Sequence, residues 1–249
     1  MPEQSKTVQM ACSVLQELEG TYGGLSLREL AQRTEKSKTA ILRVLATLAE
    51  YGLVATDANG RWEIGPAVVN MARARLRNMP LLAEALPVLR TLVASTGCTG
   101  YLGQVRADSA VVLHMEMGSQ PVVVMAQPGQ VYPAHSVAFG LAVLCEMSDR
   151  DIAATYKEHT FAPGDWAGDV AKVLEEVRRA RRRGFTQAAV MYEGMRAYGI
   201  ALLTSAGHVG ISLSMAVQGL SESAVGEREA LVLRELARAR ASMGTKGGV

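Results

Sequence analysis

The sequence feature that most constrains the fold is a pair of short helical patterns placed close together between residues 26 and 51. Ser26 stands three residues before Glu29, which is the spacing of a capping box, where each side chain satisfies a backbone N–H left unpaired by the first helical turn. The second pattern runs from about Ser37 to Tyr51 and is followed by Gly52, which suits the left-handed residue that closes a helix.

The segments on either side of this pair extend the pattern. Residues 7–19 place apolar side chains at helical spacing, which predicts a helix before the pair. After it, two strand-like runs within residues 53–64 flank the turn Asp57-Ala-Asn-Gly60, whose Asn-Gly pair tolerates the positive φ of a tight hairpin. Three short helices followed by a hairpin predict a winged helix-turn-helix domain for residues 1–65.

Beyond residue 65 the pattern changes. Pro66 opens an Arg-rich helix that extends to about residue 78, and Pro80 marks a domain boundary. We therefore expect a linker helix at residues 66–79 and a second domain at 80–249. In that domain we expect helices at 81–96, 136–147, 149–158, 168–183 and 221–243, and strands at 99–105, 110–117, 121–126, 185–191, 197–204 and 208–217. This order predicts an α+β fold with an antiparallel sheet.

Composition excludes several other classes of protein. Of the 249 residues, 49% are hydrophobic and 20% are charged, which argues against a disordered chain. The three cysteines are far apart, which argues against a disulfide framework and favours a reducing compartment. No signal-peptide pattern is visible at the N-terminus, and prolines interrupt the uncharged stretch from Met117 to Cys145 before it reaches the roughly 20 apolar residues of a membrane helix. We expect a cytoplasmic protein with no membrane partner.

The second helix of the pair carries the clearest functional signal. Lys36, Lys38 and Arg43 are positive, and no acidic residue follows until Glu50. If the apolar stripe of this helix faces the core, Lys38, Thr39 and Arg43 lie on the opposite face, where a recognition helix meets the major groove of DNA. The alternative is a solvated basic helix face, but the capped helix before it and the hairpin after it favour DNA recognition.

Individual roles follow from side-chain chemistry. Arg43 is the best candidate for reading guanine, because its planar fork matches the O6 and N7 acceptors. Short hydroxyls and amines reach phosphates, and Arg61 on the hairpin could touch a neighbouring phosphate. The predicted DNA contacts are Ser26, Lys36, Ser37, Lys38, Thr39, Arg43 and Arg61.

Net charge supports this interpretation only weakly. The formal charge is +2, and residues 1–79 hold ten basic against eight acidic residues. One copy of so modest a patch would bind DNA poorly, because affinity depends on the number of phosphates neutralised. We therefore expect a homodimer, or a dimer of dimers, with the Arg-rich helix at 66–78 as spacer or dimer element.

The sequence offers no pattern for a metal, a cofactor or catalysis. The four histidines and three cysteines show none of the short spacings of zinc sites, and no nucleophile elbow, phosphate-binding loop or paired carboxylates are visible. We expect His135 to be a structural histidine, hydrogen-bonded at a helix entrance. The predictions are no metal, no cofactor and no enzymatic activity.

An ordered set of motifs resembles the IclR family of bacterial transcriptional regulators. In the first domain the match includes Leu45-Ala-Thr-Leu48, Gly52-Leu-Val54 and Trp62-Glu-Ile-Gly65. In the second domain the following motifs occur in the order and spacing of the family: Pro87-Val-Leu-Arg-Thr-Leu92, His135-Ser-Val-Ala-Phe-Gly140, Arg183-Gly-Phe185, Gly194-Met-Arg196 and Gly207 through Ser214. The resemblance covers residues 7 to 243 and implies a GAF-like effector-binding domain.

The resemblance also implies where an effector binds. Positions matching the family's pocket are Met125, Tyr132, Ala138, Phe139, Met195, Ala197 and Ser214, with Met125 and Tyr132 as the lid. Several polar groups of the family are missing: Thr186 to Tyr192 holds no acid, and Ala197, Ala216 and Leu141 replace a Cys, a Ser and a Lys. Either the effector is larger and less polar, with an aromatic molecule among the options, or Phe139 fills the cavity.

The function implied is a ligand-responsive DNA-binding regulator, a repressor of a catabolic operon released or repositioned by a small organic effector. Two rivals stay open at this point. One is a small-molecule-binding enzyme with an appended helical module, and the other is a DNA-binding protein whose second domain serves assembly only.

Overall fold

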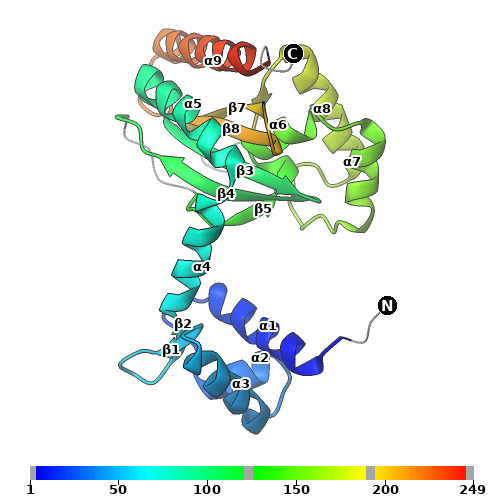
Figure 1. Cartoon of the computed structure of the whole chain (residues 1–249). Coiled ribbons are helices and arrows are strands. Elements are labelled where there is room, and N and C mark those ends of the chain that lie inside the picture. Colours follow the sequence, from blue (N-terminus) through cyan, green and yellow to red (C-terminus); the bar gives the residue numbers. More distant parts are fainter. Residues whose placement is uncertain (1–3, 121–125, 189–193, 245–249) are drawn as a thin grey trace. The chain divides into compact units, whose positions relative to one another are not determined.

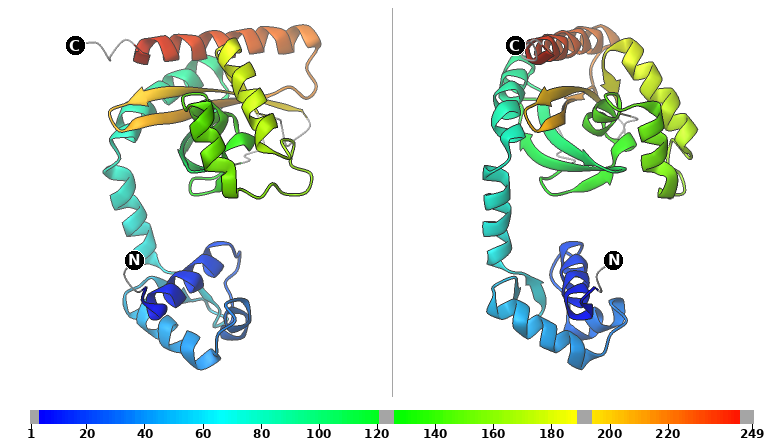
Figure 2. Two further views of the ribbon diagram at one scale, coloured as in Figure 1. Left: turned by 90° about the vertical axis from the view of Figure 1, so that its right-hand side faces the viewer. Right: turned by 45° about the vertical axis from the view of Figure 1, so that its right-hand side comes forward.

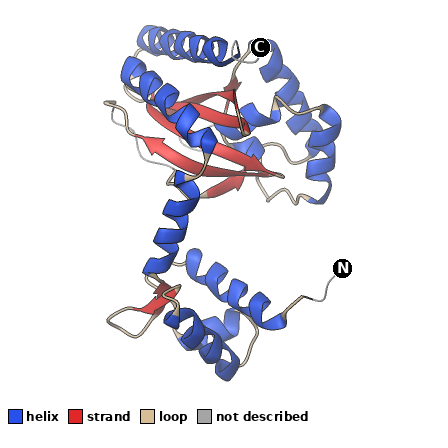
Figure 3. Ribbon diagram, viewed as in Figure 1, coloured by secondary structure: helices blue, strands red, loops and turns tan. Residues whose placement is uncertain are grey.

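The computed structural model describes residues 4–120, 126–188 and 194–244. Two compact units divide the chain, Met1–Asn78 and Met79–Val249, and each is described by itself. Figure 1 labels their helices and strands, and Figure 3 distinguishes helix, strand and loop. Within the described residues, no helix is both long and apolar enough to cross a bilayer.

The first unit is a three-helix bundle with a hairpin and a further helix. Its elements are α1 (Lys6–Glu19), α2 (Leu27–Arg33), α3 (Lys38–Glu50), β1 (Val54–Thr56), β2 (Trp62–Ile64) and α4 (Pro66–Arg77). The core draws one apolar stripe from each of the first three helices, including Val14, Leu30 and Ile41, all fully buried. This confirms the predicted helix-turn-helix followed by a wing.

Local signals in the sequence set the boundaries of these elements. The capping box forms as expected: the backbone N–H of Glu29 donates to the Ser26 hydroxyl at 3.2 Å, and the backbone N–H of Ser26 donates to Glu29 Oε2 at 2.7 Å. The Ser37 hydroxyl caps α3 by accepting from the backbone N–H of Ala40 at 3.3 Å. Gly52, with φ of 66°, follows α3 in the left-handed region. These are short-range hydrogen bonds, so the sequence alone could locate them.

The second unit is built on one antiparallel sheet of six strands in the order β5-β4-β3-β8-β7-β6. The strands are β3 (Thr99–Arg106), β4 (Ser109–Glu116), β5 (Val131–Pro133), β6 (Thr186–Gln187), β7 (Met195–Thr204) and β8 (Gly207–Ala216). The α-helices are α5 (Pro80–Thr96), α6 (Ala138–Leu144), α7 (Asp149–Thr155), α8 (Val170–Arg183) and α9 (Glu222–Gly244), with 3-10 turns at Ala134–Ser136 and Tyr156–Glu158. The α+β prediction is confirmed.

The two faces of this sheet carry different side chains. Helices α5 and α9 cover one face, where large aliphatic residues such as Ile211 and Leu213 of β8 are fully buried (Figure 2). Helix α6 lies on the other face, with α7 and α8 packed in the same hydrophobic cluster. There β8 presents Gly210, Ser212 and Ser214, because successive side chains of a strand point to opposite faces. We call this the small-residue face.

Small residues let the backbone of α6 approach the sheet directly. A Cβ atom added at Gly199 would lie 2.6 Å from the carbonyl oxygen of Ala138, and one added at Gly210 would lie 2.0 Å from that of Phe139. The Thr186 hydroxyl also donates to the Ala138 carbonyl at 2.7 Å. The entrance of α6 is therefore held against bare strand backbone.

Some predicted elements differ from the observed ones. The three-residue edge strand β5 was not expected, because so short a run ending in Pro133 has no recognisable strand pattern. The predicted helix at 136–147 is shorter, since a 3-10 turn precedes it and α6 ends at Leu144. Of the strand predicted at 185–191, residues 186–187 form β6. The strand predicted at 121–126 lies, except for Ala126, outside the described residues.

Candidate nucleic-acid interface and small-molecule pocket

The exposed side of α3 carries the predicted basic residues. Ile41, Val44 and Leu45 are buried, so the opposite side of the helix faces solvent. Lys36, Lys38, Thr39 and Arg43 are all exposed, and we call these four the α3 basic face. Among the residues that the structure describes, none of these side chains makes a hydrogen bond or an ion pair. Their charges are therefore free to meet an external anion.

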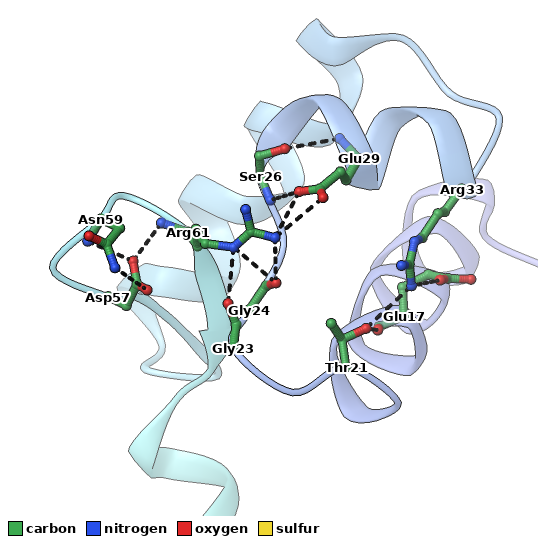
Figure 4. Close-up of polar contacts among 10 residues, drawn as sticks. All are labelled: Glu17, Thr21, Gly23, Gly24, Ser26, Glu29, Arg33, Asp57, Asn59 and Arg61. Carbon is green, nitrogen blue, oxygen red and sulfur yellow. Dashed lines mark hydrogen bonds and ion pairs between the residues drawn. The ribbon is translucent and has the colours of Figure 1, made fainter.

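Arg61 lies on the hairpin, as expected, and also makes contacts within the first unit. Its Nε donates to the Gly23 carbonyl at 3.0 Å, and its Nη2 donates to the Gly24 carbonyl and to Glu29 Oε2, each at 3.0 Å (Figure 4). The side chain thus ties the hairpin to the turn before α2. These bonds engage Nε and Nη2 in anchoring the wing, and the phosphate contact of Arg61 stays a prediction.

The same network occupies Ser26. Its hydroxyl caps α2, and Glu29 accepts from its backbone while pairing with Arg61. Hydrogen bonds from the side chain and backbone of Ser26, with Arg61 adding to them, lower the pKa of Glu29 to about 2. The Ser37 hydroxyl is likewise engaged as the α3 cap. Of the seven predicted DNA contacts, Ser26, Ser37 and Arg61 therefore make hydrogen bonds that support the structure of the first unit.

Backbone hydrogen bonds also hold the wing hairpin to the segment before α2. Leu25 and Trp62 exchange backbone hydrogen bonds of 2.8 and 2.7 Å, so the segment before α2 pairs with β2. Asp57 Oδ1 accepts from the backbone N–H groups of Asn59 and Arg61, which fixes the hairpin turn (Figure 4). The hairpin is therefore hydrogen-bonded to the segment that precedes α2.

The second unit holds a cavity of about 90 Å³ between the entrance of α6 and the small-residue face. It is lined by Tyr101, Ala126, Tyr132, Ser136, Val137, Ala138, Phe139, Ala188, Met195, Arg196, Ala197, Ser212 and Ser214. Six of the seven residues predicted for the effector site are in this set. The seventh, Met125, lies outside the described residues.

The polar groups of the pocket are mostly hydroxyls. Tyr132 donates to Gln130 Oε1 at 2.8 Å, and Ser136 donates to the Pro133 carbonyl at 2.8 Å. Within the described part of the chain, the Ser212 and Ser214 side chains make no hydrogen bond, although the two residues are only 3% and 8% exposed. Two nearly buried hydroxyls without partners suit a polar atom of a bound molecule.

Charge is nearly absent from the pocket. Arg196 is the charged residue among the described lining, and its guanidinium pairs with Glu229 of α9 at 2.6 Å. Since α9 covers the opposite face of the sheet, this guanidinium points away from the pocket. The site is apolar with a few hydroxyls, a composition that suits small organic molecules.

Phe139 belongs both to the hydrophobic core and to the pocket wall. Its side chain belongs to the buried core cluster and is 2% exposed, yet it also lines the pocket. The ring therefore packs on the sheet and limits the cavity at the same time.

Several lining residues were not predicted. Two of them are Tyr101 of β3 and Ser212 of β8, which stand opposite each other in the sheet register. The predicted residues Ala197 of β7 and Ser214 of β8 form the neighbouring pair. Ser212 has a sequence signal, because it lies two residues before Ser214 and so shares its face. Tyr101 has none, because only the pairing of β3 with β8 brings it there.

His135 is a structural residue in this fold. It is 1% exposed, its Nδ1 lies 3.1 Å from the Tyr156 hydroxyl, and its Nε2 lies 2.9 Å from Asp165 Oδ2. A second pair, His159 and Asp108, stands beside it, with the two imidazole ring centroids 5.4 Å apart. Among the described residues no group of three or more His, Cys, Asp or Glu side chains is arranged to hold a metal ion.

Comparison with known proteins gives consistent matches for both units. Residues 7–58 match the IclR helix-turn-helix domain, and residues 73–241 match the bacterial transcriptional regulator IclR C-terminal domain. The HTH-type transcriptional regulator BhcR of Paracoccus denitrificans is 27% identical over 196 residues, which are 77% of this chain and 70% of BhcR. The HTH-type transcriptional repressor AllR of Escherichia coli is 25% identical over 187 residues, 73% of this chain and 68% of AllR.

A solved structure extends the comparison to the whole fold. An IclR homologue from Microbacterium hydrocarbonoxydans, complexed with 4-hydroxybenzoate, superposes with a TM-score of 0.70 at 15% identity. The match covers 95% of this chain and 100% of that one. At this identity it supports the fold alone, with both units in the same order along the chain.

Proposed function

Because the chain belongs to the IclR family of bacterial transcriptional regulators, as the resemblance predicted, we propose that it represses a catabolic operon and is released or repositioned by a small organic effector. The observation that carries the DNA-binding part is the α3 basic face: four exposed residues, three of them cationic, with no partner among the described residues. A protein acting on chromosomal DNA in this way would work in the cytoplasm.

In a complex with DNA, the residues of the α3 basic face would contact either phosphates or a base. Lys36, Lys38 and Thr39 lie at the start of the helix, where amines and hydroxyls reach phosphates. Arg43 lies one turn further along and is placed for the paired acceptors of guanine. With so few cations in one copy, two copies of α3 per assembly are needed for useful affinity, so we propose that the protein binds its operator as a homodimer or a dimer of dimers.

The pocket of the second unit is the proposed effector site. The nearly buried, unpaired hydroxyls of Ser212 and Ser214 support it, as does the agreement between its lining and the positions expected from the family. The name of AllR calls that protein a repressor, and the Microbacterium homologue holds an aromatic acid. We propose a compact, mostly apolar effector with one or two polar atoms, rather than a larger one, because the cavity is about 90 Å³.

The effector can act only by binding better to one DNA-binding state than to the other. Coupling between two sites is typically about 1–3 kcal/mol, which corresponds to a change of roughly 5- to 150-fold in operator affinity. This arrangement needs no chemical turnover, and we propose that the protein is not an enzyme.

The Ser214→Val variant tests the division of labour between the two units. The substitution removes a pocket hydroxyl, so the response of operator binding to effector should fall while effector-free operator affinity stays unchanged. Fluorescence anisotropy with a duplex from upstream of the protein's own gene measures both, with a panel of small organic acids and phenols as effectors. If the variant loses operator affinity and effector response together, or if effector turnover is observed, the proposed function is wrong.

A further inference from the structure

The ring of Phe139 occupies a position on the sheet where β3 has no side chain. A Cβ atom added at Gly103 would lie 2.1 Å from Cε2 and 2.4 Å from Cδ2 of Phe139. Real Cβ atoms essentially never approach other atoms this closely, so the aromatic ring and any side chain at position 103 exclude each other. The register of the β3–β4 pair also shifts between Leu102 and Gly103, so the ring sits on an irregular point of the ladder.

The backbone of Phe139 also lies close against the sheet. Its carbonyl oxygen stands 2.0 Å from the place where a Cβ at Gly210 would be, and the preceding carbonyl of Ala138 is held by the Thr186 hydroxyl. Paired glycines on two neighbouring strands, Gly103 of β3 and Gly210 of β8, therefore leave the space that the ring and the backbone of Phe139 occupy. The position of the ring therefore depends on these two glycines and on the backbone of Phe139, as well as on the rotamer of its side chain.

The same ring limits the pocket. Phe139 lines a cavity of about 90 Å³ whose other walls include Ala197, Ser212 and Ser214, all small residues. The larger lining side chains come from β3, β5, β7 and α6: Tyr101, Tyr132, Met195, Arg196 and Phe139. An apolar cavity of about 150 Å³ holds benzene in another protein, so a cavity of about 90 Å³ leaves room for one small ring at most.

We propose that Phe139, seated over Gly103, sets the upper size of the effector at about one ring. This inference deepens the proposed function and rests on it, because it concerns the same pocket. Removing the ring would join its volume to the cavity and admit a molecule of two fused rings. A side chain at position 103 would then require a smaller residue at position 139, whereas a smaller residue at 139 is compatible with Gly103.

Two probes that differ only in size test the inference. Phenol and 2-naphthol each carry one hydroxyl for Ser212 or Ser214, on one ring and on two fused rings. Thermal unfolding of the full chain is followed with each probe. Phenol should stabilise the wild-type protein more than 2-naphthol does, and this order should reverse in Phe139→Ala. A tenfold excess over Kd corresponds to an increase in Tm of about 3 °C for a chain of this size.

A matched control separates pocket volume from loss of core. Phe161 is also a phenylalanine of the same hydrophobic cluster but does not line the pocket. Phe161→Ala should lower Tm without reversing the order of the two probes. If both alanine variants reverse it, a loosened core and not the ring position explains the effect, and the inference fails.

A double-mutant cycle tests the pair without any ligand. Gly103→Ala should lower Tm sharply in the wild-type background, and it should cost less than half as much in Phe139→Ala, where the ring is gone. The Val111 carbonyl, 2.8 Å from the added Cβ, accounts for the part that remains. Equal losses of Tm in the two backgrounds would overturn the packing assignment.

The outcomes for size selection and for regulation can be told apart. An unchanged probe order in Phe139→Ala, or no stabilisation of either protein by either probe, contradicts the inference even if operator binding is intact. A reversed order in a protein that binds no operator supports the inference about the pocket and refutes the regulatory function on which it was based.

Discussion

The α3 basic face consists of side chains that the fold leaves in solvent, whereas the pocket lies where small residues of the sheet let a helix entrance approach bare strand backbone. In the first region the functional groups can be changed without touching the core. In the second, the residues that shape the site are also residues that hold α6 on the sheet. Substitutions should therefore separate binding from stability in the first unit and affect both in the second.

The largest effect is expected from Gly210→Ala. The added Cβ would meet the backbone of Phe139 at 2.0 Å, so the second unit should lose about 3 kcal/mol or more of stability. The matched control is Gly226→Ala in α9, where nothing lies within 4 Å of the added atom and where a helical Gly-to-Ala change should stabilise by about 0.5–1 kcal/mol. Calorimetry of the two variants measures the difference, and equal Tm values would contradict the close approach of α6.

Arg43→Ala should weaken DNA binding and leave the stability of the protein nearly unchanged. We expect operator binding to weaken by about 1–3 kcal/mol and preference at one base pair to relax, because a paired contact to guanine is lost. Stability should change by no more than about 0.5 kcal/mol, since the side chain is exposed. Lys157→Ala, an exposed cation of the second unit, is the control for charge alone. An Arg43→Ala protein with unchanged affinity and base preference would refute the recognition role.

Arg61→Ala distinguishes wing anchoring from phosphate contact. Loss of its bonds to the carbonyls of Gly23 and Gly24 and to Glu29 should destabilise the first unit by about 1 kcal/mol. The dependence of operator affinity on salt should keep its slope. A residue that contacts phosphate would instead reduce that slope by about 1 when removed, so such a result would restore Arg61 to the DNA-binding set.

The smallest effect is a pH dependence at Glu29. Its pKa falls from the ordinary 4.5 to about 2 on folding, so the carboxylate stabilises the first unit above pH 4.5. That contribution is lost as pH falls from about 4.5 to 2, because the unfolded chain then binds the proton more readily. Urea unfolding across this range should show a weaker acid destabilisation in Glu29→Gln than in the wild type. If the free energy of unfolding depends on pH identically in the two proteins, the carboxylate of Glu29 does not stabilise the first unit as proposed.

The same contrast explains what could be predicted from the sequence. The first unit is defined by local signals: the spacing from Ser26 to Glu29, the apolar stripe of α3 and the Asn59-Gly60 turn all act within a few residues. The pocket depends on the pairing of β3 with β8, which connects residues more than 100 positions apart. Family resemblance supplied six of its lining residues, but Tyr101 and the contact between Phe139 and Gly103 follow only from the folded sheet.

Arg61 shows a different limit of sequence reasoning. An arginine on a wing hairpin is as suitable for a phosphate as for a carbonyl, and nothing local decides between them. The turn that brings Gly23 and Gly24 beside β2 does decide, through the backbone pairing of Leu25 with Trp62. Side-chain chemistry therefore predicted what Arg61 can bind, and the tertiary fold added partners within the chain that the sequence did not reveal.

The central claim is that α3 docks on duplex DNA, twice per assembly. Its most direct test is a salt titration of purified protein with a labelled duplex from upstream of its own gene, followed by fluorescence anisotropy. We predict binding whose affinity falls steeply with salt, as expected when several phosphates are neutralised, and a shallower slope for Lys36→Ala/Lys38→Ala. Absence of salt-dependent binding, with or without the small-molecule panel, would contradict the account.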